Sequence, residues 1–181
     1  AHKQGFKAEQ EEAFKKANIP EFYIKSCKTL QYLFPKAHAV AYVLSAYRIA
    51  YCKVHHPKEF YSAYFTIRAP KFDFVEVHKG INFMRSFIKN VGQQGTKASV
   101  NDKETATYME LAVEMLARGF EFEDVDLYRS DAHQFIVTDK GLLPPLGAIG
   151  GIGGVAAENI VKARSKGPFI SREDLRNRAK I

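Results

Sequence analysis

At 181 residues, with 46% hydrophobic and 26% charged residues, the chain has the composition of a soluble globular protein, which excludes an intrinsically disordered one. It has no run of eighteen apolar residues and no apolar signal-peptide core, so we expect no membrane span, no secretion and a cytoplasmic location. Because the chain begins with Ala1 rather than Met, we interpret it as a segment of a longer protein.

Prolines and apolar periodicity predict that the first third of the chain is helical. We predict a short charged helix over residues 6–17. Pro20 opens a second helix, which spans about 20–33, because proline suits the first helical turn. Pro35 repeats this start and opens a third helix over 36–56. The residues of the third helix that we expect to face a core are Val40, Val43, Leu44, Tyr47, Tyr51 and Val54.

The middle of the chain continues with weaker helical signals. Residues 58–68 follow Pro57 and predict an aromatic-rich helix packed against the third one. A further helix is expected over 75–91, and the glycine-containing run 92–97 predicts a loop. The apolar side of the helix over 75–91 consists of Phe83, Phe87 and Val91.

A stronger helical pattern covers 103–118, with Asp102 as its expected N-cap and Gly119 as its C-terminal stop. Its apolar face consists of Tyr108, Leu111, Ala112 and Met115. Residues 134–138 and 142–143 predict the single hairpin of an otherwise helical fold.

Pro144-Pro145 separates this part from a glycine-rich segment, and we place a domain boundary there, with domains over 1–143 and 144–181. The sequence LGAIGGIGGVAAENIVKAR predicts a short helical entry, a glycine turn and a helix over 154–164. This pattern is typical of a helix-hairpin-helix motif. The apolar residues expected to hold its two helices together are Ile149, Ile152 and Ile160.

The glycine turn predicts a contact with DNA phosphates. Gly151 and Gly153 allow backbone angles that a side chain forbids, and with Gly154 they let a phosphate approach the backbone. The free N–H groups at the start of the following helix, aided by the helix dipole, favour an anion. Lys162 and Arg164 are placed to reach neighbouring phosphates.

Two other interpretations of the turn remain open. Gly151-x-Gly153-x-x-Ala156 matches a dinucleotide-binding fingerprint, but no β-branched strand precedes it. The acidic residues about twenty positions later lie in SREDL, which begins a helix with Ser171 as N-cap. A purely structural glycine turn is the second alternative. The SREDL helix itself suggests a second copy of the motif, as in tandem motifs that grip both strands of a duplex.

Charge is concentrated in two zones. Residues 24–58 contain no Asp or Glu, and their basic residues are Lys25, Lys28, Lys36, Arg48, Lys53 and Lys58. Residues 149–181 contain three acidic residues, and their basic residues are Lys162, Arg164, Lys166, Arg172, Arg176, Arg178 and Lys180. The zones predict two contacts with a polyanion, or two solvated basic surfaces.

Cysteine and histidine positions do not favour a metal site. Cys27 and Cys52 form no CxxC pair, and we interpret them as buried structural thiols. His55 and His56 are adjacent, so they point to different sides of a helix.

Several segments, in order, resemble bacterial family C replicative DNA polymerases, the alpha subunits of DNA polymerase III. FPKAHAVAYVLSAYRIAYCKVHHPKEFYSAYFT (34–66) resembles their fingers segment. IPEFYIKSCKTLQYLFPKAHA (19–39), RGFEFEDVDLYRSDAHQFIV (118–137) and GLLPPLGAIGGIG (141–153) resemble the PolC branch.

The resemblance implies binding partners: double-stranded template-primer DNA, an incoming deoxynucleoside triphosphate, and the rest of a polymerase chain and its replisome. It implies that Lys36 and His38 lie near the triphosphate, which agrees with their place at a helix start in an acid-free zone. His38 as a core histidine is the alternative. Arg48 and Lys53 face template or primer phosphates, or only solvent.

The family's chemistry requires Mg²⁺ ions held by paired aspartates of the palm, which lies upstream of the fingers. The acidic candidates Asp124, Asp126 and Asp131 match a fingers segment instead, so we assign no catalytic residue and no cofactor to this chain. We expect a polymerase fragment that is inactive alone. The alternative is a stand-alone, non-enzymatic DNA-binding module that is indifferent to sequence.

Overall fold

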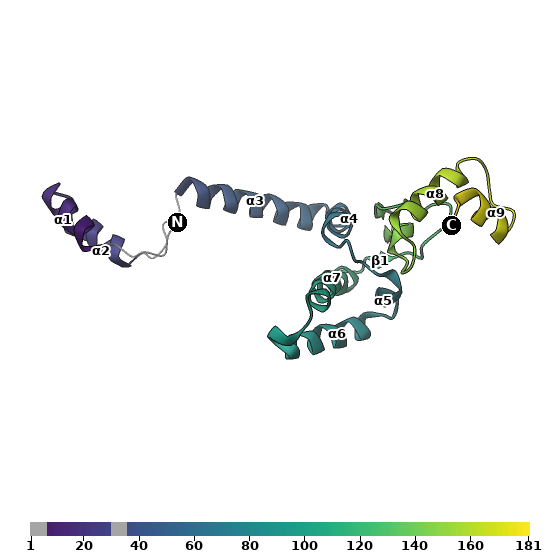
Figure 1. The fold of residues 1–181 in the computed structure, drawn as a ribbon, viewed down its shortest axis with the longest axis horizontal. Helices are drawn as coiled ribbons and strands as arrows, with labels where there is room; N and C mark the ends of the chain where they lie inside the picture. Colours follow the sequence, from purple (N-terminus) through teal and green to yellow (C-terminus); the bar gives the residue numbers. More distant parts are fainter. Residues whose placement is uncertain (1–6, 30–35) are drawn as a thin grey trace. The chain divides into compact units, whose positions relative to one another are not determined.

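The computed structural model describes residues 7–29 and 36–181, and the fold is mainly α-helical with one small sheet, as predicted (Figure 1). The chain divides into two compact units, Ala1–Ala50 and Tyr51–Ile181. None of the helices in the described parts is both long enough and apolar enough to cross a membrane.

The first unit begins with two short helices, α1 (Ala8–Lys16) and α2 (Glu21–Thr29), as predicted. The expected end of the second helix, near Leu33, lies outside the described residues. α1 and α2 pack together around the buried side chain of Ile24. The carboxylate of Glu11 binds the ammonium groups of Lys15 at 2.8 Å and Lys28 at 2.6 Å, which links the two helices at the surface.

Helix α3 (Lys36–His55) forms over the predicted residues, but the prediction that its apolar face is buried in a core is wrong. The six apolar residues from Val40 to Val54 that we expected in a core are 47–71% exposed. Periodicity shows that a helix has an apolar face, but it does not show what covers that face. Among the described residues, nothing covers the apolar face of α3. Cys52 on the same helix is also exposed, and Cys27 is half-buried, so neither is the buried thiol that we expected.

Helix α4 (Pro57–Arg68) starts with Pro57 in its first turn. Its buried residues, Tyr61 and Phe65, lie in the hydrophobic core of the second unit, and the packing of this helix against α3 stays a prediction. Two further helices, α5 (Phe74–His78) and α6 (Ile81–Gln94), replace the single helix expected over 75–91. Gly80 at φ +95° separates them. The expected loop over 92–97 is the end of α6 and a 3₁₀ turn, η1 (Gly95–Lys97).

Helix α7 (Val100–Ala117) lies beside α6 and starts earlier than predicted (Figure 1). Its N-cap is Ser99, whose hydroxyl accepts a hydrogen bond from the Asp102 amide at 3.0 Å, so the assignment of Asp102 as N-cap is wrong. The side chain of Asp102 instead accepts from the Ser99 hydroxyl. Gly119 at φ +84° ends the helix, as predicted. The expected apolar face is confirmed, with Tyr108, Ala112 and Met115 buried and Leu111 partly buried.

The sheet has three short strands in the order β1-β3-β2. The predicted hairpin is confirmed as β2 (Ile136–Val137) antiparallel to β3 (Gly141–Leu143). A strand that we did not predict, β1 (Glu121–Phe122), pairs parallel with β3. A Cβ atom at Gly141 would overlap the Glu121 carbonyl, so this pairing requires glycine there.

The core of the second unit is aromatic. Rings of Phe65, Phe72 and Phe135 lie 4.9–5.5 Å apart, and Tyr108 and Phe122 pack beside them. A second hydrophobic cluster joins 3₁₀ helix η2 (Leu146–Ala148), α8 (Gly154–Arg164) and α9 (Arg172–Ala179). This second cluster also contains Val125, Leu127 and Ala132. The domain boundary after residue 143 stays a prediction, and the packing of the C-terminal helices extends upstream of it.

A polar network connects the end of α3 with α4 and α7. The Glu114 carboxylate accepts hydrogen bonds from Lys53 Nζ at 2.7 Å and from the Tyr61 hydroxyl at 2.9 Å. Arg118 donates to the Tyr61 hydroxyl and to the Lys53 carbonyl, both at 3.0 Å. Burial raises the pKa of Glu114, but the hydrogen bonds from Lys53 and Tyr61 outweigh it and hold this pKa below its usual value.

Replacing Glu114 by Gln should lower the free energy of unfolding near neutral pH by about 1 kcal/mol, a modest value because the carboxylate is partly solvated. Since the folded-state pKa is lowered, the contribution of Glu114 is present at neutral pH and disappears as the pH falls below about 5. Urea unfolding across this pH range measures both effects. The exposed Glu110→Gln is the control, and a Glu114→Gln chain with unchanged acid sensitivity would contradict the assignment.

Candidate nucleic-acid interface

The glycine turn predicted from the sequence lies between η2 and α8. Gly151 has φ +90°, a conformation that side-chain-bearing residues rarely adopt, and the Ile152 amide closes the turn by donating to the Ile149 carbonyl at 3.1 Å. Gly153 is the N-cap of α8 with φ −69° and ψ 157°, which any residue can adopt. The expectation of special backbone angles is therefore confirmed for Gly151 and wrong for Gly153.

The start of α8 has no side-chain cap. Asp73, Ser99 and Ser171 cap α5, α7 and α9 through side-chain oxygens, whereas Gly153 has no side chain to offer. The first N–H groups of a helix have no acceptor within the helix, so those of α8, which begin at Gly154, remain available to an external anion. Ile160 of α8 is buried and Ile152 is half-buried in the same cluster, so both help to hold the motif together, as expected. Ile149 is half-buried outside that cluster.

Two loops flank the turn. A Cβ atom at Gly150 would lie 3.2 Å from a carboxylate oxygen of Asp73, and one at Gly154 would lie 3.1 Å from the His133 ring. A hollow of about 400 Å³ opens beside the turn, and Phe65, Phe135 and Ile152 are among its lining residues. Close approach of these loops leaves little room for larger side chains at Gly150 and Gly154.

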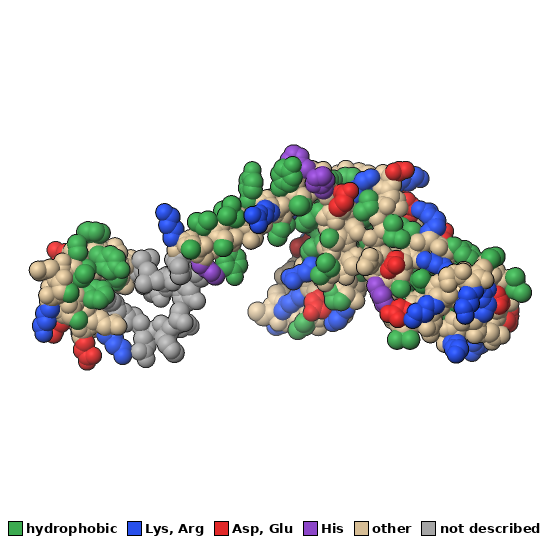
Figure 2. Space-filling model, turned by 90° about the horizontal axis from the view of Figure 1, so that it is seen from above, with side chains coloured by type: hydrophobic (Ala, Val, Ile, Leu, Met, Phe, Trp, Pro, Cys, Tyr) green, Lys and Arg blue, Asp and Glu red, His purple; other side chains and the backbone are tan. Residues whose placement is uncertain are grey.

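The basic residues near the turn have different surroundings. Lys162 is 74% exposed, with only a long ion pair to Glu158 at 3.9 Å. Arg164 instead donates to the Leu127 carbonyl at 2.8 Å and is half-buried. A second hollow of about 280 Å³ lies between α8 and α9, and Lys162, Lys166 and Lys180 contribute to its lining. Figure 2 shows Lys and Arg side chains gathered over the C-terminal helices.

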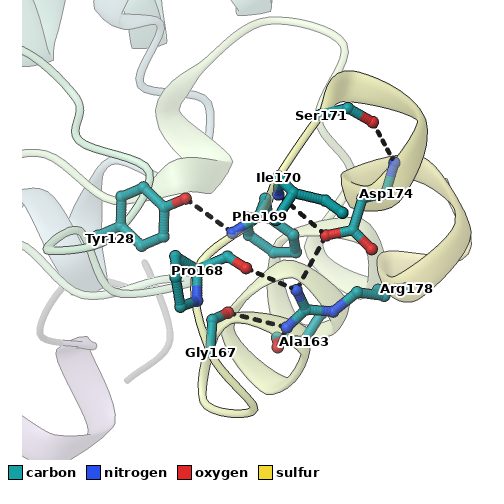
Figure 3. A network of polar contacts seen from close by, with 9 residues as sticks. All are labelled: Tyr128, Ala163, Gly167, Pro168, Phe169, Ile170, Ser171, Asp174 and Arg178. Carbon is teal, nitrogen blue, oxygen red and sulfur yellow. Dashed lines mark hydrogen bonds and ion pairs between the residues drawn. The ribbon is translucent and has the colours of Figure 1, made fainter.

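Arg178 of α9 organises the loop between α8 and α9 (Figure 3). Its guanidinium donates to the carbonyls of Ala163, Gly167 and Pro168 and to the Asp174 carboxylate. It also lies over the Phe169 ring, 4.6 Å from the centroid. The loop is held from the other side by the Tyr128 hydroxyl, which accepts from the Phe169 amide at 3.0 Å. Of the contacts that Arg178 makes, only the one with Asp174 has a signal in the sequence, namely the i,i+4 spacing of the two residues.

The other predicted site residues lie on α3. Lys36 and Arg48 are exposed, and His38, also exposed, has its ring 4.4 Å from that of Tyr42, which does not fit a core histidine. Lys53 binds Glu114 and lies over the Phe60 ring. The structure thus brings the glycine turn and Lys162 together on α8, and it leaves the four residues of α3 in a different part of the chain.

The acidic residues of the loop before β2 stabilise turns. Asp126 accepts from the amides of Tyr128 and Arg129, and these hydrogen bonds lower its pKa. Burial raises the pKa of Asp131, but hydrogen bonds from the amides of His133 and Gln134 lower it further than burial raises it. Across residues 7–29 and 36–181, no three His, Cys, Asp or Glu side chains converge as a metal site would require.

The chain is similar to known proteins both in this motif and over nearly its whole length. The family model for the helix-hairpin-helix motif matches residues 119–181. Over 98% of its length the chain is 49% identical to the DNA polymerase III PolC-type of Bacillus subtilis (strain 168) and 51% identical to that of Oceanobacillus iheyensis. The PolC-type enzyme of Caldanaerobacter subterraneus subsp. tengcongensis is 46% identical over the same share. The chain spans 12–13% of the length of these relatives.

Replacing Arg178 by Lys should lower the free energy of unfolding of the C-terminal region by about 2 kcal/mol, because an ammonium group cannot reach all the acceptors of the planar guanidinium. Urea unfolding is the measurement. Arg176→Lys, the same change at an exposed position of the same helix, should have almost no effect. Equal stability of the two variants would show that the Arg178 contacts contribute nothing.

Proposed function

We propose that the chain is a segment of a PolC-type DNA polymerase III, and that its helix-hairpin-helix region binds duplex DNA through the phosphate backbone. The observation that carries this proposal is the uncapped start of α8 behind Gly151, within the 63 residues from 119 to 181 that match the motif. The near 50% identity to PolC-type polymerases over 98% of the chain supports the polymerase assignment.

The chemistry of the turn favours phosphate over a base. Backbone N–H groups and the positive end of the α8 dipole bind an anion without regard to nucleotide identity. Lys162 adds an exposed ammonium group two turns further along α8. Arg164 was expected to contact DNA as well; it is half-buried and one of its nitrogens donates to the Leu127 carbonyl, so we rank it below Lys162. We therefore place the phosphate contacts at Gly151, Gly153, Gly154 and Lys162.

For the N-terminal half we propose the role of polymerase fingers, with Lys36 and His38 near the triphosphate of the incoming nucleotide. Support comes from their exposure on the first turn of α3, where the helix dipole favours negative charge. Arg48 is exposed and suited to a template or primer phosphate. Lys53 would have to exchange its Glu114 partner for a phosphate, so we rank it below Arg48.

We further propose that nucleotide transfer takes place on residues of the longer protein that this chain does not contain. Backbone amides occupy Oδ1 of Asp126 and of Asp131, and among the described residues neither carboxylate belongs to a group of three that could hold a metal ion, so neither supports a Mg²⁺ site. The alternative function, a stand-alone DNA-binding module, rests on the helix-hairpin-helix match alone. The coding sequence separates the two: an open frame that continues upstream of Ala1 excludes the stand-alone module.

The isolated chain should not extend a primed template in the presence of Mg²⁺ and all four deoxynucleoside triphosphates. The measurement is a gel-based primer-extension assay, with an intact PolC-type polymerase as positive control. Metal-dependent synthesis by the chain alone would show that it contains a catalytic centre.

Replacing Gly151 by Val should weaken duplex binding at least about tenfold, because a β-branched residue strains a turn at positive φ by about 1–3 kcal/mol and displaces the α8 amides. Fluorescence anisotropy over a salt series should give a slope of about −0.9 in log K against log salt for each phosphate contact. Gly95→Val is the matched control: Gly95 also has positive φ and open surroundings, but it lies on η1. If Gly151→Val loses its helical circular dichroism signal, the turn is required for folding, and weaker binding by this variant is then no evidence for a DNA contact.

A further inference from the structure

A short row of polar side chains runs along α8 from the glycine turn. His133 Nε2 lies 2.9 Å from one carboxylate oxygen of Glu158, and Lys162 Nζ lies 3.9 Å from the other. Gly154, Glu158 and Lys162 are spaced four residues apart, so they occupy one face of the helix. The His133 ring is at the Gly154 end, 3.1 Å from the position of a Cβ atom there. Glu158 therefore stands between the turn and Lys162.

We propose that Glu158 limits the affinity of the glycine turn for DNA, by placing a carboxylate beside the phosphate site and by competing with the phosphates for Lys162 and His133. This inference rests on the proposed DNA-binding function of the turn, and it concerns the strength of that binding. The three side chains are 47–74% exposed, so a DNA strand that reaches the turn also reaches them.

Glu158 lies close enough to the start of α8 for its charge to affect phosphate binding there. Four helical residues span about 6 Å, so a phosphate at the first turn of α8 and the Glu158 carboxylate are separated by less than about one Debye length at physiological salt. Hydrogen bonding from His133, and then the charge of Lys162, keep the pKa of Glu158 below its usual value, so the carboxylate is ionised wherever DNA is bound at neutral pH. Repulsion across this distance corresponds to a two- to tenfold change in affinity, on the order expected for a solvated pair.

A weak contact suits a protein that moves along DNA. Phosphate contacts without sequence preference allow sliding, because each bound register has nearly the same free energy as the next. Each strong additional contact slows the exchange between registers. An acidic residue inside an otherwise basic region would keep the exchange fast, and Glu158 is the acidic residue on α8.

The test compares duplex binding by wild type, Glu158→Gln and Glu110→Gln over a salt series at neutral pH. Glu110 is exposed on α7, so the control changes net charge equally without touching the turn. We expect Glu158→Gln to bind about two- to tenfold more tightly, with a salt slope steeper by up to about 0.9, because Glu158 no longer competes with the phosphate for Lys162. Glu110→Gln should stay close to wild type, and Glu158→Gln with Lys162→Gln should lose the added slope.

A purely structural role for Glu158, as a tether of the His133 loop, predicts the opposite sign, since loosening the site weakens binding. Unchanged or weaker binding by Glu158→Gln therefore overturns the inference. If this variant melts early, Glu158→Ala is the second variant, because alanine favours the helix and removes the same charge. Gly151→Val is measured in parallel: a wild type that does not bind DNA, or a Gly151→Val that binds equally well, defeats the proposed function itself.

Discussion

Three phenylalanine rings, from Phe65, Phe72 and Phe135, meet in the core of the second unit, and the position of the glycine turn depends on this contact. α4 also holds the Phe135 backbone directly: the Ser62 hydroxyl donates to its carbonyl and the Thr66 hydroxyl accepts from its amide. The residues beside two of these rings flank the turn, since Asp73 follows Phe72 and His133 precedes Phe135 by two positions. Packing in the aromatic core thus fixes the two loops that flank the glycine turn, which is itself formed mainly by backbone.

The basic residues divide into those that bind protein and those that are free to bind a ligand. Arg118, Arg164 and Arg178 donate to backbone carbonyls, which suits a planar group with several fixed donors. The lysines near the turn make long or solvated ion pairs, or none among the described residues. For the proposed DNA contact, the residues with accessible charge near the turn are therefore the lysines around α8 and the exposed Arg172 and Arg176 of α9.

Local sequence signals predicted the elements well where one residue determines the backbone. Pro57 separates α3 from α4, Gly119 ends α7 and Gly151 forms the turn, because each acts through its own φ angle. The predictions failed where the answer depended on distant partners. Among the described residues the apolar face of α3 is exposed, and β1 was missed because a two-residue strand has no measurable period. Likewise, the contact between His133 and Glu158 spans 25 positions and leaves no local pattern.

Gly153 shows why the site had to be interpreted from structure as well as sequence. The sequence suggested that it provides backbone freedom, yet its angles are those of an ordinary N-cap, where Ser, Asp or Asn would be favoured. A side-chain oxygen there would satisfy an amide of α8 from within the protein. Glycine at an N-cap costs the helix only a few tenths of a kcal/mol, so the fold tolerates it easily. What glycine contributes is the absence of an internal acceptor, and that absence leaves the α8 amides available to a phosphate.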